Sequence, residues 1–167
     1  ANLSEAIAHV ERNSSDELKH DLALRKLSQY VGGTTEDSTS RVLVSRWQKQ
    51  APSFSLAYAL EMGVFFSILP ALTKYGDMYC VKVSQWISDD EGVHVLVNRE
   101  LAAVLDERLT KEHLSLVVET LLWVFEPLGA VQAKEVCARA IRRLKSGSDP
   151  LMMQQSVPVT PAFFEQV

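Results

Sequence analysis

Apolar residues recur every three or four positions along most of this 167-residue chain, the spacing that places side chains on one face of an α-helix. The 7 glycines and 6 prolines are few, and they lie between these periodic stretches. The pattern predicts an all-α protein, with residues 1–145 forming a helical bundle domain and residues 146–167 an irregular C-terminal tail.

The pattern also sets the expected helix boundaries. Ser14, Ser15 and Asp16 are candidate N-caps, so a first helix is expected to end before them and a second to begin there. Pro70 should bend the helix that contains it, unless a local bulge absorbs the distortion. The expected helices cover residues 3–12, 14–30, 40–49, 53–75, 78–109, 111–125 and 133–144.

Composition narrows the class of partner. The 17 basic and 21 acidic residues give a net charge of -4, which offers no electrostatic reason to expect nucleic acid or an anionic membrane surface. The apolar stretch 54–72 is interrupted by Glu61, Ser67 and Pro70, so no membrane span is expected. The N-terminal residues lack the pattern of a secretory signal. Cys80 and Cys137 suit reduced, packed thiols, and the chain is expected to be cytoplasmic.

Three residues on the two long helices suggest metal chemistry. Glu61 stands within an apolar stripe, where a carboxylate needs protonation, a cationic partner or a metal ion. Glu91 and His94, three positions apart, share one face of the next helix. Glu-x-x-His on one helix and Glu on its neighbour make half of the dimetal site of ferritin-like bundles, and such ligands suit iron or manganese. The alternative is a surface Glu–His pair beside a snorkelling acid. His9, His20 and His113 are expected to be solvated.

Two sequence strings resemble a known family. LEMGVFFS and ISDDEGVH are similar to VEGIFFS and ISRDEGLH in the small, radical-generating subunit of class I ribonucleotide reductase, most closely in its eukaryotic and viral branch. The closing PAFFEQV resembles the family's Asn-Phe-Phe-Glu-Lys. The resemblance covers the second half of that subunit and implies a partial, ferritin-like bundle and an intracellular protein, with a viral origin suggested by the motif.

The resemblance also implies roles for individual residues. It makes Glu61, Glu91 and His94 metal ligands for iron or manganese. Asp90 would be the acidic residue of the electron-transfer network. The apolar pocket around the radical would consist of Phe65, Leu69 and Ile87.

Several features of the family's first half have no counterpart here. That half supplies an Asp, a Glu-x-x-His and a radical tyrosine four residues after the His. One register places residues 1–4 over Glu-x-x-His and Ala8 over the tyrosine, and a second uses Glu5 and His9. Neither register has the tyrosine, and the metal site is therefore expected to be incomplete in this chain. Asp89 also replaces the family's Arg.

These observations predict a degenerate or partial small subunit in deoxyribonucleotide synthesis, inactive alone and unable to form the tyrosyl radical by itself. Its expected partners are a second copy or a companion small-subunit chain, together with the large subunit of ribonucleotide reductase. The alternative is a non-catalytic helical scaffold derived from the same fold, without a metal.

Overall fold

A computed structural model describes residues 3–30 and 38–145, and every regular element in these two ranges is helical. This confirms the all-α class. The expected tail, 146–167, lies outside the described residues. The elements are α1 (Leu3–Tyr30), α2 (Ser38–Gln48), α3 (Phe54–Gly63), the π-helical turn η1 (Val64–Ile68), α4 (Leu69–Tyr75), α5 (Met78–Val104), α6 (Lys111–Val124), the 3₁₀ turn η2 (Glu126–Leu128) and α7 (Ala130–Lys145).

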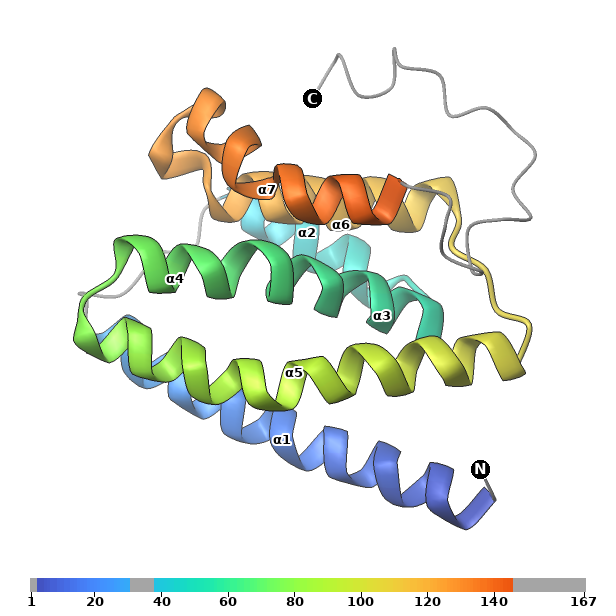
Figure 1. The fold of residues 1–167 in the computed structure, drawn as a ribbon. Helices are drawn as coiled ribbons and strands as arrows, with labels where there is room; N and C mark the ends of the chain where they lie inside the picture. Colours follow the sequence, from blue (N-terminus) through green and yellow to red (C-terminus); the bar gives the residue numbers. More distant parts are fainter. Residues whose placement is uncertain (1–2, 31–37, 146–167) are drawn as a thin grey trace.

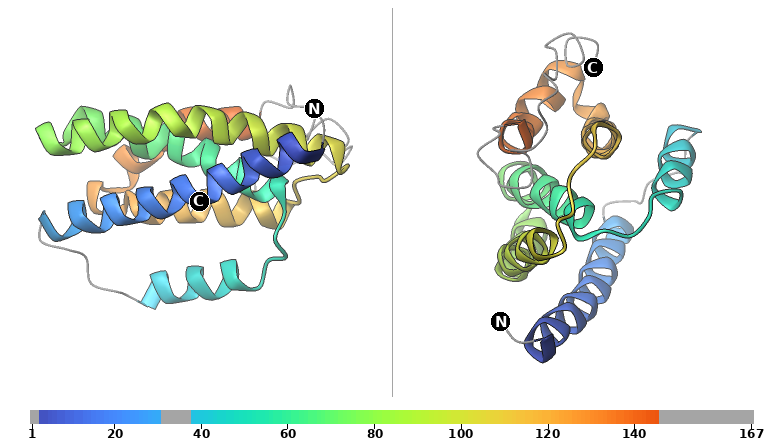
Figure 2. Two further views of the ribbon diagram at one scale, coloured as in Figure 1. Left: turned by 90° about the horizontal axis from the view of Figure 1, so that it is seen from below. Right: turned by 90° about the vertical axis from the view of Figure 1, so that its right-hand side faces the viewer.

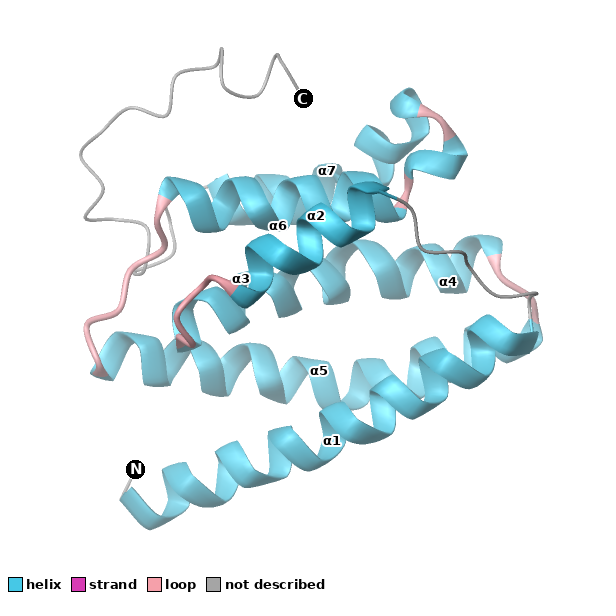
Figure 3. Cartoon of the chain, turned by 180° about the vertical axis from the view of Figure 1, so that it is seen from behind, coloured by secondary structure: helices cyan, strands magenta, loops and turns pink. Residues whose placement is uncertain are grey.

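The helices lie in layers around a central rod made of α3, η1 and α4 (Figure 1). One side of this rod packs against α5, and α1 crosses α5 and packs against it. The other side packs against α6 and α7. Figure 2 shows α1 and α2 at the margin of the assembly, and Figure 3 shows α2 in front of α6, against which it packs. The best-enclosed core therefore lies between the central rod and α6–α7.

Apolar side chains from three elements fill this core. Leu56 and Met62 come from α3, Val117 and Leu121 from α6, and Cys137 from α7, all less than a tenth exposed. On the outer side of α6, the indole nitrogen of Trp47 donates to Thr120 Oγ1 at 3.0 Å and Arg46 pairs with Glu119. Leu43 of α2 is buried and Trp47 packs against the core, so both apolar and polar contacts attach α2.

The first 28 described residues form one helix, so the predicted break at Ser14 is wrong. Ser14 and Ser15 are exposed, where serine lowers helix stability only slightly. Asp16 is buried, and its carboxylate accepts a 2.6 Å hydrogen bond from Lys19. The side chain read as a cap thus lies within the helix, on the face that packs against α5.

Pro70 is accommodated by a bulge, as one of the two expectations had it. The chain stays helical from Phe54 to Tyr75, but Val64–Ile68 forms a π-helical turn in which the Leu69 N–H donates to the Val64 carbonyl, five residues back. The wider turn gives the proline ring room. It also rotates the residues after it relative to Glu61, so the single stripe expected from a uniform α-helix does not hold.

The helix beginning at Met78 ends at Val104, five residues before the expected end. Asp106 takes a left-handed conformation with φ of 54°, and the Glu107 N–H donates to the Ala102 carbonyl, a combination that terminates helices. The Glu107 carboxylate then accepts from the Ser55 N–H at 2.9 Å, at the beginning of α3. The loop therefore terminates one helix and caps another.

Candidate metal centre

Two antiparallel helices each carry the sequence Asp-Glu-x-x-His. It stands at 16–20 on α1 and at 90–94 on α5, and the two helices cross where these segments meet. One ligand atom from each of four residues lies within 4.8 Å of the other three. The four residues are Glu17, His20, Glu91 and His94. Because Glu and His three apart share a helix face, each helix contributes both of its ligand side chains to one point.

The contacts between the two segments are crosswise. His94 Nδ1 on α5 hydrogen-bonds Glu17 Oε1 on α1 at 2.9 Å. His20 Nδ1 on α1 lies 3.3 Å from Glu91 Oε1 on α5. Each imidazole thus meets the glutamate of the other helix, and the two segments are related by an approximate two-fold axis.

The Nε2 atoms of the two imidazoles also face acidic residues of the opposite helix. His20 Nε2 lies 3.3 Å from Asp90 Oδ2, within hydrogen-bond reach. His94 Nε2 lies 3.7 Å from Asp16 Oδ2. Each histidine is therefore flanked by the glutamate and the aspartate of the opposite helix.

Glu61 lies beside this group but is not one of its four residues. Its Oε1 accepts a 2.7 Å hydrogen bond from Asn98 on α5. Its other oxygen, Oε2, is buried without a hydrogen-bond partner in the described structure. It offers a free ligand atom next to the group, on the helix that the sequence indicated.

Buried atoms without partners concentrate at this crossing. Among the described residues, four atoms here are buried and make no hydrogen bond: His20 Nδ1, His94 Nε2, Glu91 Oε2 and Glu61 Oε2. Leaving such an atom unpaired costs about 1–3 kcal/mol. Nitrogen and carboxylate oxygen are the ligands that iron, manganese and zinc accept, so His20 Nδ1, Glu91 Oε2 and Glu61 Oε2 fit a transition-metal ion.

Burial sets the acidity of the group, and neighbouring charges modify it. Burial, reinforced by Glu17 and Glu61, raises the pKa of Glu91 to about 8. Burial likewise raises the pKa of Glu61 to about 7, against the opposing hydrogen bond from Asn98. Burial alone would lower the pKa of His94, but Glu17 and the neighbouring acids raise it overall. Without a cation the site therefore retains protons, and a divalent ion would replace them.

The structure brings some of the predicted site residues together and separates others. Glu91 and His94 are in the four-residue group, 3% and 1% exposed. Asp90 lies against His20, and Glu61 lies next to the group. Leu69 and Ile87 are buried, while Phe65 contacts Phe66 edge-to-face and lines a surface hollow.

Sequence reasoning missed Glu17 and His20. The expectation of a solvated His20 is wrong, since its side chain is 3% exposed. Of the registers weighed for the first Glu-x-x-His, the one at Glu5 and His9 places both residues on the exposed surface of α1, while the other begins at residues outside the described ranges. The signal that would have found the pair is the repeated Asp-Glu-x-x-His at 16–20 and 90–94, which was overlooked because Asp16 was taken as a candidate N-cap and His20 as solvated.

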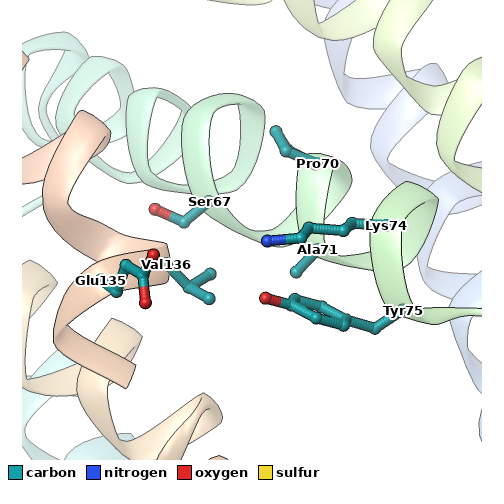
Figure 4. Close-up of a pocket in the computed structure, with 7 residues that line it drawn as sticks. All are labelled: Ser67, Pro70, Ala71, Lys74, Tyr75, Glu135 and Val136. Atoms are coloured by element: carbon teal, nitrogen blue, oxygen red, sulfur yellow. The ribbon is translucent and has the colours of Figure 1, made fainter. Parts of the chain in front are cut away.

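Two hollows lie elsewhere, along η1 and α4. One, of about 150 Å³, lies between α4 and α7, where the Lys74 ammonium and the Tyr75 hydroxyl point toward Val136 and Glu135 (Figure 4). The other is wider and shares Pro70 and Lys74 with the first. Ser67 lines the smaller hollow. Burial raises the pKa of the Cys137 thiol to about 11. The thiol is therefore no nucleophile, and neither hollow touches the four-residue group.

The rod from Phe54 to Tyr75 is long and apolar enough to cross a membrane, judged by length and composition alone. It is, however, the central element, packed between α5 and the α6–α7 pair, and it carries Glu61. The core helix of a soluble protein passes the same test of length and composition.

No family model, curated protein or solved structure matches this chain.

Proposed function

We propose that this chain binds iron or manganese between α1 and α5 and acts as a ribonucleotide reductase small-subunit-like protein that cannot form a tyrosyl radical by itself. The observation that carries the proposal is the crossing of two Asp-Glu-x-x-His segments, with four ligand atoms within 4.8 Å of one another. Two Glu-x-x-His helices, with one further Glu from each of two other helices, make the ligand pattern of carboxylate-bridged bundle sites. Glu61 supplies one of these two further carboxylates.

Roles for the individual residues follow from this proposal. Glu17, His20, Glu91 and His94 would hold the metal, with Glu61 as an additional carboxylate ligand. Bound iron or manganese would supply redox reactivity toward dioxygen. The radical tyrosine of the family stands four residues after the first-half His, and Leu24 holds that position after His20. The chain would therefore need a companion chain, and through it the large subunit, to take part in deoxyribonucleotide synthesis.

A second candidate function, a metal-free scaffold, is favoured by the contacts that the site residues make with one another. The 2.9 Å His94–Glu17 hydrogen bond and the 2.7 Å Asn98–Glu61 hydrogen bond already join helices without an ion. In that case the same residues would serve only to hold α1, α3 and α5 together. Their replacement by apolar residues can then either raise or lower the free energy of unfolding.

The first experiment is elemental analysis of the natively purified protein, with intact masses of every chain that co-purifies. Stoichiometric iron or manganese supports the metal-binding function, and stoichiometric zinc alone would contradict a redox role. No metal in the native protein, with no binding of added Fe²⁺ or Mn²⁺, would leave the scaffold.

Substitutions then connect the metal to the site. Glu91→Ala and His94→Ala should each weaken Mn²⁺ binding at least 100-fold, while Asp89→Ala, an exposed position on the same helix, should leave it unchanged. Glu61→Ala should also weaken Mn²⁺ binding, because it removes the additional carboxylate ligand. After loading with Fe²⁺ and exposure to air, electron paramagnetic resonance should show no stable tyrosyl radical, and its appearance would contradict the proposed inability.

A further inference from the structure

The approximate two-fold symmetry of the site places an aspartate beside each of its two histidines. His20 has Glu91 at Nδ1 and Asp90 at Nε2, both from α5. His94 has Glu17 at Nδ1 and Asp16 at Nε2, both from α1. In both histidines Nδ1 faces the glutamates, where the ion would lie, and Nε2 faces an aspartate.

A carboxylate on the outer nitrogen of a metal-bound imidazole has a defined effect. It accepts the Nε2–H, which fixes the proton on that nitrogen and leaves the Nδ1 lone pair for the metal. It also holds the ring in one orientation and increases the basicity of the ligand. Asp16 meets the requirements, because it is 5% exposed and its carboxylate faces a nitrogen that makes no hydrogen bond in the described structure.

We propose that Asp16 is a positioning residue that orients His94 for the metal, as the symmetry-related counterpart of Asp90 at His20. The proposal rests on the proposed metal-binding function and extends it to a residue outside the ligand set.

The surroundings of Asp16 keep it charged and in place. Lys19 Nζ donates to Asp16 Oδ1 at 2.6 Å, which leaves Oδ2 to face both His94 Nε2 and Arg12 Nε, each at 3.7 Å. At 3.7 Å the contact with His94 is longer than a hydrogen bond, and a small rotation of the imidazole on metal binding would close it. One oxygen is thus anchored by a lysine, and the other is available to the histidine.

The test uses Co²⁺ as the probe, with the full chain. Calorimetric titration should show Asp16→Asn binding Co²⁺ about 10- to 100-fold more weakly than the unmodified protein, with Asp90→Asn losing a similar factor. The matched control is Asp21→Asn, because Asp21 is an exposed acid on α1 that pairs with Arg25, and its Co²⁺ affinity should be unchanged.

A spectroscopic readout separates positioning from a general loss of structure. The Co²⁺-loaded protein should give two exchangeable, strongly shifted imidazole N–H proton resonances, one from each histidine. Asp16→Asn should broaden the His94 resonance by faster exchange with water and leave the His20 resonance intact, while Asp90→Asn should do the reverse.

Each outcome bears on the idea. Unchanged affinity with both resonances intact in Asp16→Asn would overturn the positioning role. Weaker binding with the His94 resonance retained would overturn it in favour of Asp16 as a direct ligand. Failure of the unmodified chain to bind Co²⁺ would instead reject the metal-binding function on which the inference rests.

Discussion

At the scale of single residues, three groups at the site hold protons more tightly in the folded chain than in the unfolded one. The pKa of Glu61 is about 7 and that of Glu91 about 8, against 4.5 for an ordinary Glu, and the pKa of His94 is also raised. Above the ordinary pKa of Glu the folded state therefore binds more protons than the unfolded state. Stability from these groups is lost as pH rises through their folded-state pKa values.

The metal-free protein should accordingly be less stable at about pH 8.5 than at about pH 5.5, by on the order of 2 kcal/mol in urea unfolding. Glu91→Gln should flatten this slope. Metal affinity should change in the opposite direction and increase with pH, because the ion displaces the same protons. A metal-free protein whose stability increased across this range would contradict the assignment of these groups as protonated.

At the scale of the helices, two glycines in α3 and α5 make a matched pair. A Cβ on Gly63 would lie 3.0 Å from Leu121 Cδ1, at the close approach of α3 to α6, whereas a Cβ on Gly92 would meet nothing within 4 Å. Leu121 is 1% exposed and has little room to move.

Gly63→Ala should therefore lower the free energy of unfolding by about 1 kcal/mol, since overpacking outweighs the gain in helix propensity. Gly92→Ala should raise it by about 0.8–1.0 kcal/mol through propensity alone. Chemical denaturation of both variants measures the two changes in the free energy of unfolding, which should have opposite signs. A stabilised Gly63→Ala would mean that α6 shifts easily.

The elements show how far periodicity alone reaches. It predicted the all-α class, and the turn at Gly76 and the beginning of α6 are where it placed them. It could not place the end of α5, because Leu109 is fully buried yet lies in a loop, and burial of an apolar residue looks the same in both settings. Half of the site was predicted, because the Glu91–His94 spacing was interpreted as a ligand pair. The same spacing at Glu17–His20 lay within the expected helix 14–30 but was not interpreted so, because a histidine among charged and polar neighbours looks solvated in the sequence.

At the scale of the whole molecule, α1 is attached unusually. Among its described side chains the buried ones are Asn13, Asp16, His20 and Leu27, so only one is apolar. Several of its large apolar residues, Leu18 and Leu22 among them, face outward. Hydrophobic burial therefore contributes little to holding α1 against α5, and two of the four candidate ligands belong to it.

Bound metal should consequently stabilise the docking of α1 far more than the rest of the fold. At free Mn²⁺ about 100 times the dissociation constant, amide hydrogens of α1 should exchange about 100-fold more slowly than in the metal-free protein. Amides of α3 and α6 should change little. His20→Ala should abolish the effect, and equal protection of α1 with and without metal would contradict this coupling.

The ring of Trp86 contacts His20 edge-on, with centroids 5.5 Å apart. Of the chain's 3 tryptophans it alone lies at the crossing of α1 and α5, while Trp47 and Trp123 are on α2 and α6. Trp86 therefore reports on the site through its fluorescence. A paramagnetic ion bound at His20 would quench the emission of Trp86 strongly and that of the other two tryptophans weakly. The state of the site can be read from the ultraviolet fluorescence of the unlabelled protein.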